Sequence, residues 1–288
     1  MALGLVVLLA VVQGIAEFLP ISSSGHLRVI AELFGLDDPQ TLFDVMLHVG
    51  TLVAVVVVYR ERVAGLFGAL GRLFDRSGRS WPTRWREDTD LRVLAFVVAA
   101  TVPTGVIALS LGKVLEGWAA SLAFVGGALL VNAALLVVLG RLIRRTQGQR
   151  EGRGLDAMTL RDALLIGLAQ GFAVTRGISR SGSTITAGVL LGLRQDAAAT
   201  FSFLLSIPAI LGALVLTMKD FDGEVSALMP GFFGAVIAGV VGVVALKLLL
   251  KMLDRGRLGV FAIWCAAVGV FAIVWHLTGG HGGPPLQP

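Results

Sequence analysis

The sequence has little charge and almost no cysteine, and each shortage excludes a class of protein. Only 15% of its 288 residues are charged while 56% are hydrophobic, which is too apolar for a soluble domain. The single cysteine, Cys265, excludes an intrachain disulfide. No lysine or arginine precedes the first apolar stretch, and Gln13 and Glu17 interrupt it, so we do not expect a cleaved signal peptide. The composition therefore predicts an integral membrane protein.

A polar break containing serine and glycine interrupts the first apolar region and recurs in the second half of the chain. Residues 13–25 align without a gap with residues 170–182, and seven of the thirteen pairs are identical. The identical pairs are Gln13/Gln170, Gly14/Gly171, Ala16/Ala173, Ile21/Ile178, Ser22/Ser179, Ser24/Ser181 and Gly25/Gly182. A duplicated break of this kind points to a site built from discontinuous membrane helices near the middle of the bilayer. Two surface loops are the weaker interpretation, because they have no reason to repeat.

We predict an all-α polytopic membrane protein built as an inverted repeat, with one re-entrant helical hairpin and three transmembrane helices in each half. The hairpins are expected because the apolar segments beside each break are too short to cross about 30 Å of hydrocarbon. The first repeat is residues 1–140, with a hairpin at about 4–36, its tip at 22–25, and spans at about 41–59, 91–111 and 121–140. The second is residues 159–277, with a hairpin at about 159–193 and spans at about 197–218, 229–250 and 257–277.

The remaining segments are expected to connect these elements. Residues 61–74 have apolar side chains at helical spacing with Arg62 and Arg72 among them, as an interfacial amphipathic helix does. A soluble helix packed on the protein is the alternative. The other expected connections are a solvated loop at 75–90, a turn with Lys113 and Glu116 between the second and third spans, a basic linker at 141–158 and a flexible tail at 278–288.

The distribution of basic residues predicts the orientation. Residues 60–92 contain eight Lys and Arg, residues 141–161 six and residues 251–257 three, whereas the loops near Lys113 and Lys219 have one each. By the positive-inside rule the basic loops are cytoplasmic and both termini lie outside. Three spans in each half make the second hairpin enter from the face opposite to the first. The two tips are then expected to meet near the midplane.

The residues at the two tips are suited to an anion. Backbone N–H groups at a helix N-terminus, reinforced by the helix dipole, favour negative charge, and serine hydroxyls and a guanidinium add donors that fit phosphate oxygens. The residues expected to bind phosphate are Ser22, Ser24, Gly25, Arg176, Ser179, Ser181 and Thr184. Simple helix capping by Ser22 and Ser24 remains an alternative. We therefore predict a site for phosphate or pyrophosphate.

Glu17, Ser23 and His26 add groups that binding alone does not need. His26 titrates in the range for proton transfer, and Glu17 could orient it, act as a base or hold a divalent cation that bridges phosphates. Ser23 aligns with Arg180, so a phosphoryl group near the two-fold axis could touch both. This suggests Ser23 as nucleophile with His26 as acid and base, while the competing assignment makes His26 the nucleophile.

Purely structural roles also remain open for these residues. Glu17 and Arg180 could form a structural ion pair, and His26 could be a hydrogen-bonded core histidine. Asp44 and His48 are four residues apart on one face of the first span and are expected, with Gln13, to line or brace the cavity outside the catalytic set. Arg176 would share a helix face with Arg180 and contact the distal phosphate if the hairpin is helical there. Its alternative is to snorkel towards the cytoplasmic interface.

These motifs resemble the undecaprenyl-pyrophosphate phosphatase family, the bacitracin-resistance proteins of bacterial inner membranes. The family's first signature, (E/Q)-x-x-x-E and then Pro-x-Ser-Ser-x-Gly-His, corresponds to Gln13–Glu17 and Pro20–His26. The second, Pro-Gly-x-Ser-Arg-Ser-x-x-Thr, corresponds to residues 176–184, with Arg176 in place of the first proline. The resemblance implies that Glu17, Ser23, His26 and Arg180 form the catalytic set.

The same resemblance implies the activity. The expected reaction is hydrolysis of a C55 polyprenyl pyrophosphate to the monophosphate carrier lipid and inorganic phosphate, with the active site facing the periplasm or the outside. A divalent cation, Mg²⁺ or Ca²⁺, is an expected cofactor with Glu17 as its ligand, and a homodimer is an expected assembly. No nucleic-acid partner is expected. A transporter or flippase for a polyprenyl phosphate is the alternative, because an inverted repeat with a midplane site suits it equally well.

Overall fold

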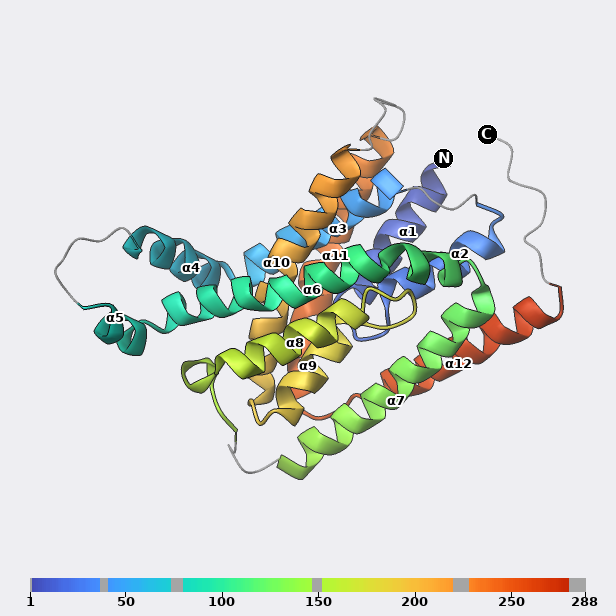
Figure 1. Cartoon of the computed structure of the whole chain (residues 1–288). Helices are drawn as coiled ribbons and strands as arrows, with labels where there is room; N and C mark the ends of the chain where they lie inside the picture. The colour runs from blue at the N-terminus through green and yellow to red at the C-terminus, as the bar shows by residue number, and fades with distance from the viewer. Residues whose placement is uncertain (1, 37–40, 74–79, 147–151, 220–227, 280–288) are drawn as a thin grey trace.

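The computed structural model describes residues 2–36, 41–73, 80–146, 152–219 and 228–279, and these residues form helices and connecting turns without a strand. The predicted tail falls almost wholly on residues 280–288, outside the described part. The helices are α1 Leu3–Ala16, α2 Ser23–Leu33, α3 Thr41–Val58, α4 Arg60–Arg72, α5 Trp81–Glu87, α6 Thr89–Ala119, α7 Leu122–Thr146, η1 Leu155–Ala157, α8 Leu160–Phe172, α9 Arg180–Leu190, α10 Gln195–Lys219, α11 Leu228–Asp254 and α12 Gly259–Leu277 (Figure 1).

Five of the described helices, α6, α7, α10, α11 and α12, are long and apolar enough to cross a membrane. The helices α3 and α4 form a sixth candidate if they are taken together as one broken span, and they are bent by 87° at the break. The bend turns the amphipathic residues of α4 away from the direction of α3. The prediction of an all-α polytopic membrane protein is confirmed.

Both predicted hairpins consist of two short helices separated by a break. α1 ends at Ala16 and α2 begins at Ser23, while α8 ends at Phe172 and α9 begins at Arg180. The second helix of the first hairpin begins within the predicted tip, because Ser22 caps it by accepting a hydrogen bond from the Gly25 N–H at 3.3 Å. Ser179 accepts from the Gly182 N–H at 3.1 Å in the same way. The two breaks are therefore capped at corresponding positions.

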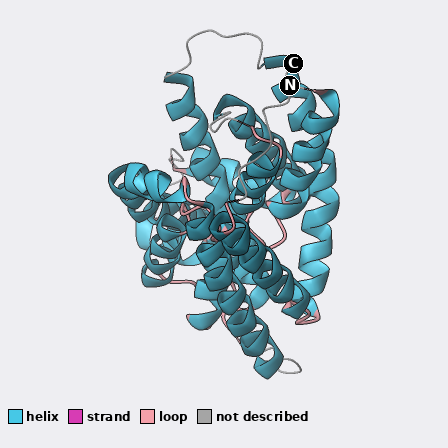
Figure 2. Ribbon diagram, turned by 90° about the vertical axis from the view of Figure 1, so that its right-hand side faces the viewer, coloured by secondary structure: helices cyan, strands magenta, loops and turns pink. Residues whose placement is uncertain are grey.

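The tips of the hairpins touch each other inside the helical bundle. A Cβ atom added to Gly25 would lie 2.9 Å from the Cα of Gly177, so neither backbone could approach the other if a side chain stood between them. Gly177 also has φ 101°, in the region that favours glycine. Figure 2 shows loop segments, in pink, running through the middle of the molecule among the helices. The expectation that the tips meet agrees with this packing.

The remaining helices surround the hairpins. α1 packs mainly on α11 and α8 mainly on α6, while α3 packs on α11 and α7 on α12. Figure 1 shows α7 and α12 running side by side. Their contact is close because Gly126 and Gly269 face each other: a Cβ on either would lie within 2.8 Å of the other's carbonyl oxygen. Small residues at such crossings let membrane helices pack backbone to backbone.

Two of the predicted connections differ from the structure. The segment expected to be a solvated loop contains α5, Trp81–Glu87. A proline stands in the first turn of this helix, where a backbone N–H would have no partner within the helix. The expected turn at Lys113 and Glu116 is also wrong, since α6 continues to Ala119. Both side chains are exposed on the helix surface, and a charged residue there gives no reason for a helix to end.

Candidate active site

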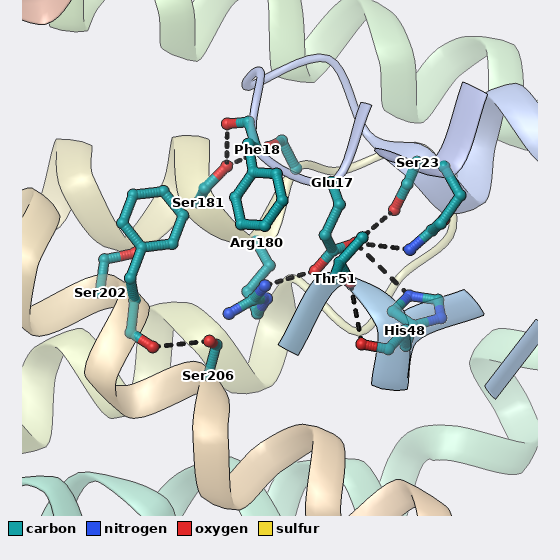
Figure 3. Close-up of polar contacts among 12 residues, drawn as sticks. Glu17, Phe18, Ser23, His48, Thr51, Arg180, Ser181, Ser202 and Ser206 are labelled. Carbon is teal, nitrogen blue, oxygen red and sulfur yellow. Dashed lines mark hydrogen bonds and ion pairs between the residues drawn. The ribbon is translucent and has the colours of Figure 1, made fainter. Parts of the chain in front are cut away.

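The carboxylate of Glu17 lies at the centre of the polar contacts (Figure 3). Glu17 directly follows α1 and is only 8% exposed. Its Oε2 accepts a hydrogen bond from Ser23 Oγ at 2.8 Å and one from Gln13 Nε2 at 3.2 Å. Its Oε1 pairs with Arg180 of the second hairpin. One carboxylate thus joins a hydroxyl from the first hairpin to a guanidinium from the second.

Arg180 is the first residue of α9, and its side chain crosses from the second hairpin to the first. Its Nη2 donates to Glu17, which supplies the partner that a buried cation needs. Its Nη1 is buried and has no hydrogen-bond partner among the described residues. A guanidinium nitrogen left in this way is a donor ready for an anionic oxygen. Ser23 and Arg180, which align in the repeat, therefore lie close together, and Glu17 binds both of them.

His48 approaches Glu17 from α3. Its Nε2 lies 3.4 Å from Glu17 Oε2, and its Nδ1 donates to the backbone carbonyl of Asp44 at 2.8 Å. The Thr51 hydroxyl donates to the His48 carbonyl at 2.9 Å (Figure 3). A ring nitrogen that faces a carboxylate oxygen fits either a protonated imidazole or a cation shared by both. His48 therefore contacts Glu17 directly. The backbone carbonyl of Asp44 lies on the other side of the His48 ring and orients it.

The ring of His26 makes different contacts from those the sequence suggested. Its Nδ1 lies 2.8 Å from the carbonyl oxygen of Ser22, and its Nε2 accepts a hydrogen bond from the indole N–H of Trp264 at 2.8 Å. Both ring nitrogens are therefore engaged away from Ser23. The hydroxyl of Ser23 donates to Glu17 instead. The pairing of Ser23 with His26 is not the arrangement found in this structure.

The other expected phosphate-binding hydroxyls are already hydrogen-bonded within the protein. Ser22 and Ser179 cap their helices through Gly25 and Gly182, as described above. Ser24 lies half-buried with its Oγ 3.5 Å from Ser22 Oγ. The buried Ser181 hydroxyl donates to the Phe18 carbonyl at 3.4 Å, and Thr184 lies 2.5 Å from Ser202. These side chains line the region around the break, and their contact with a phosphate stays a prediction.

Arg176 lies in the break of the second hairpin and not on a helix. The chain is non-helical from residue 173 to 179, and Gly177 has φ 101°. The argument that Arg176 and Arg180 share a helix face, which assumed a helix between them, is therefore wrong. Arg176 is half-buried in this break. A contact with the distal phosphate remains a prediction for this residue.

Asn132 is a site residue that the sequence motifs did not reveal. It lies on α7, is completely buried, and connects the two breaks: its Nδ2 donates to the Pro20 carbonyl at 2.9 Å, and its Oδ1 accepts from the Ser179 N–H at 3.0 Å. One signal was present, because this is the only asparagine of the chain and it stands within an apolar span. Trp264 was also missed, since nothing in the sequence distinguishes it from a lipid-facing aromatic residue.

The described residues offer a divalent cation few ligands. They contain no group of three or more His, Cys, Asp and Glu side chains placed to hold a metal ion. The best pair is Glu17 Oε2 and His48 Nε2, whose ring orientation is held by the Asp44 carbonyl. Two ligands fit a Mg²⁺ ion only if a substrate supplies phosphate oxygens, as is usual for this metal. The residues therefore suit a cation that enters with its substrate.

The fold and the site together define a class: a multi-pass membrane protein whose polar, ionisable centre is buried where two interrupted helices meet. A family model described as "Bacitracin resistance protein BacA" matches residues 6–271, and the chain belongs to this family.

Relatives from distant organisms agree with the match. The chain is 39% identical over 266 residues to a protein of Treponema denticola, covering 92% of this chain and 94% of the relative. It is 41% identical over 277 residues to one of Rhodopirellula baltica, covering 94% and 97%, and 40% identical over 266 residues to one of Desulfosudis oleivorans, covering 91% and 94%. All three relatives are named undecaprenyl-diphosphatase.

Proposed function

We propose that this protein is an undecaprenyl-diphosphatase, which hydrolyses undecaprenyl pyrophosphate to undecaprenyl phosphate and inorganic phosphate and so recycles the carrier lipid for cell-wall synthesis. Relatives of this name extend over more than nine tenths of the chain. The single observation in the structure that supports the chemistry is the buried carboxylate of Glu17, which accepts from the Ser23 hydroxyl and pairs with Arg180. A hydroxyl, a proton acceptor and an anion-binding donor are the parts that such a reaction needs.

In the proposed reaction Ser23 is the nucleophile. Its Oγ attacks the terminal phosphorus, an O–P bond forms, and its proton passes to Glu17, which already accepts it at 2.8 Å. The bond between that phosphorus and the bridging oxygen breaks, and undecaprenyl phosphate leaves. Water then hydrolyses the phosphoserine, releases inorganic phosphate and restores the hydroxyl. Glu17 takes the role of base because His26 has no free ring nitrogen in this arrangement.

Arg180 is proposed to hold the transferring phosphoryl group. Its Nη2 is bound to Glu17, and its buried Nη1 has no partner among the described residues, so a phosphoryl oxygen could be bound without breaking the ion pair. The guanidinium would then keep the negative phosphate and the negative carboxylate apart. Charge that develops on the phosphoryl oxygens would be stabilised by a donor already in place.

The other phosphate contacts are proposed around the same two breaks. Ser22, Ser24 and Gly25 belong to the first, and Arg176, Ser179, Ser181 and Thr184 to the second. What supports them is their position at the starts of α2 and α9, where the helix dipoles favour an anion. Several hydroxyls would have to exchange a bond within the protein for one to the phosphate.

A Mg²⁺ or Ca²⁺ ion is proposed to join the site with its substrate. Glu17 and His48 are the residues that would hold it, and when bound it would neutralise part of the pyrophosphate charge. The chain's own contribution is to orient the His48 ring through the Asp44 carbonyl and to keep Nε2 facing Glu17. Replacing His48 with glutamine is expected to weaken binding of the cation in calorimetry of the protein with a substrate analogue.

The membrane, the orientation within it and the oligomeric state are also part of the proposal. We place the protein in the bacterial cytoplasmic membrane with its basic loops inside and the catalytic hairpin open to the periplasm or outside, because Lys and Arg concentrate in alternate connections. The inverted repeat is supported by the equivalent caps of α2 and α9 and by the matching contacts of α1 with α11 and of α8 with α6. A homodimer is proposed from the resemblance alone.

The test is phosphate release from undecaprenyl pyrophosphate by the purified protein in detergent, followed by trapping of the intermediate. A phosphoserine survives acid, whereas a phosphohistidine is lost in acid and survives alkali, so the two assignments of the nucleophile are separated. We expect an acid-stable adduct that is absent from Ser23→Ala. Lipid translocation by proteoliposomes without phosphate release would instead identify a transporter of the polyprenyl phosphate.

A further inference from the structure

Trp264 makes a contact with the site that the proposed reaction does not use. It lies on α12, where 53% of its surface is exposed on the outside of the described structure, beside the more exposed Ile263 at 72% and Val260 at 65%. This face of an apolar helix is turned towards the lipid. The indole N–H nevertheless donates to Nε2 of the buried His26 at 2.8 Å. A lipid-facing helix thus supplies a hydrogen-bond donor to the polar centre.

This bond and the bond to the Ser22 carbonyl select the same tautomer of His26. A neutral imidazole has one donor nitrogen and one acceptor nitrogen, and the partners of the ring select the tautomer. The indole of Trp264 can only donate, so Nε2 must accept and carries no proton. The proton is therefore on Nδ1, which lies 2.8 Å from the Ser22 carbonyl oxygen and donates to it.

The carbonyl held by His26 belongs to a residue with a strained backbone. Ser22 has φ 73° and is the only residue other than glycine with a positive φ in the described ranges. Such a conformation persists only where the surroundings hold it. The Ser22 carbonyl also accepts from the backbone N–H of His26 at 3.2 Å, so His26 holds the turn through both backbone and ring. Ser23, whose hydroxyl meets Glu17, is the next residue in the chain.

We propose that Trp264 is a positioning residue: its indole N–H binds Nε2 and fixes the orientation of the His26 ring, and the ring in turn holds the Ser22 turn that presents Ser23 to Glu17. If the donor is removed, the proton stays on Nδ1, but the ring is anchored at one nitrogen only and can swing away from its 2.8 Å contact with the Ser22 carbonyl. The turn relaxes, and the Ser23 hydroxyl loses its place beside Glu17. The effect on turnover rests on the proposed function, whereas the effect on the ring rests on these contacts alone.

The structure offers a matched pair of variants on one helix. Trp264→Phe keeps an aromatic ring and removes the N–H. Trp275→Phe makes the same change at a tryptophan whose indole nitrogen is buried and has no hydrogen-bond partner among the described residues. The full-length protein in detergent, labelled with ¹⁵N-histidine, reports the hydrogen bonds of the two ring nitrogens by NMR, and the His26 signal is assigned by its loss in His26→Gln. Turnover of undecaprenyl pyrophosphate is measured on the same samples.

We expect the parent protein to show a hydrogen-bonded acceptor at Nε2 of His26, Trp264→Phe to show an Nε2 without this bond, and Trp275→Phe to resemble the parent. In Trp264→Phe kcat should fall about ten- to a hundred-fold while KM stays within about two-fold, because a small displacement of a reacting group reduces the rate and leaves the binding contacts in place. A second variant with 3-benzothienylalanine at position 264 preserves the shape of the ring and lacks only the N–H. It is expected to behave like Trp264→Phe and guards against a folding defect of the phenylalanine variant.

The possible outcomes separate this proposal from the phosphatase assignment. An unchanged Nε2 signal of His26 in both position 264 variants overturns the contact between Trp264 and His26. A changed Nε2 signal with unchanged kcat overturns the positioning role. A parent protein that shows the Trp264-dependent Nε2 signal but releases no phosphate counts against the phosphatase function and removes the role in turnover, while the contact between Trp264 and His26 stands.

Discussion

Glu17 is the residue on which the two hairpins converge, and its neighbours make the roles of individual side chains testable. Ser23→Ala is expected to abolish phosphate release, and Glu17→Gln to reduce kcat by about 10²- to 10⁴-fold, the range for loss of a general base. Ser23→Ala should remain as stable as the parent because it removes little packing, whereas Glu17→Gln also leaves Arg180 without its charged partner and should lower the melting temperature. His26→Ala is also expected to be inactive. Ser183→Ala in the second hairpin is the control, since this half-buried serine aligns with His26 and has no proposed role.

Normal turnover by Ser23→Ala would remove it as nucleophile. Continued phosphate release by both Ser23→Ala and His26→Ala would contradict the phosphatase mechanism altogether.

Asn132 allows a second prediction at the scale of the residue. Asn132→Ala removes the partners of the buried Pro20 carbonyl and Ser179 N–H, and each unsatisfied group costs about 1–3 kcal/mol. We expect a lower melting temperature and a loss of activity, because the two breaks are no longer held together. Cys265→Ala is the control: its thiol lies 3.4 Å from Asn132, and a weak sulfur contact contributes little. Equal stability of the two variants would contradict the bridging role.

The two interrupted hairpins are the elements that build the site, and Gly177 permits the second one to pack closely on α7. A Cβ at Gly177 would lie 2.7 Å from the Ala128 Cβ and 2.7 Å from the Val125 carbonyl, at φ 101°. Gly177→Ala is therefore expected to destabilise the protein by about 1–2 kcal/mol through its φ and by about 1–3 kcal/mol more through overpacking. Thermal unfolding in detergent measures the sum.

Gly192→Ala separates these two effects. Gly192 has φ 88°, but nothing lies within 4 Å of an added Cβ, so only the backbone cost is expected. Equal destabilisation of the two variants would show that the second break does not pack closely on α7 at Gly177.

The junction between α4 and α6 depends on an ion pair whose strength varies with pH. Arg72 donates to Asp88 at 2.6 and 3.1 Å, and this bond, with help from the Leu91 N–H, holds the pKa of the Asp88 carboxyl below its usual value of 3.8. A lowered folded-state pKa stabilises the fold at pH values above the unfolded pKa, and this contribution is lost as the pH falls through the folded pKa. The contribution is at most about 1 kcal/mol, because Arg72 is partly exposed.

We therefore expect α4 to loosen below about pH 4, the ordinary range for an aspartate. The protection factors of the α4 amides against hydrogen exchange, corrected for the intrinsic rate at each pH, should fall there in the parent protein and should stay constant over this range in Asp88→Asn. Identical profiles for the two proteins would remove the ion pair as the cause.

At the scale of the whole molecule, we predict that the basic loops lie in the cytoplasm. In a Cys265→Ala background, Ser80→Cys lies in the basic region between α4 and α6, and Glu116→Cys lies at the exposed far end of α6. A membrane-impermeant thiol reagent is expected to label position 116 from outside and position 80 only after the membrane is opened. The reverse pattern would invert the topology and turn the catalytic hairpin to the cytoplasm.

The sequence by itself determined the class of fold, the two breaks and most of the residues that meet in the candidate site. Long apolar runs cannot remain in water, and a polar serine and glycine break cannot face lipid, so composition and repetition were sufficient for the hairpins and for Glu17, Ser23 and Arg180. Errors occurred where the local sequence has weak signals. The end of α6 and the helix at 81–87 depend on packing and on water exposure more than on residue type.

Only the tertiary structure decided which groups face each other. It brings Ser23 to Glu17 and not to His26, breaks the helix between Arg176 and Arg180, and introduces Asn132 and Trp264 from helices whose sequences look like ordinary apolar spans. The physical reason is that a hydrogen bond requires a direction and a distance of about 3 Å, and these are set by how helices distant in the chain pack together. Periodicity places a side chain on a face of its own helix but cannot say which donor from another helix will meet it.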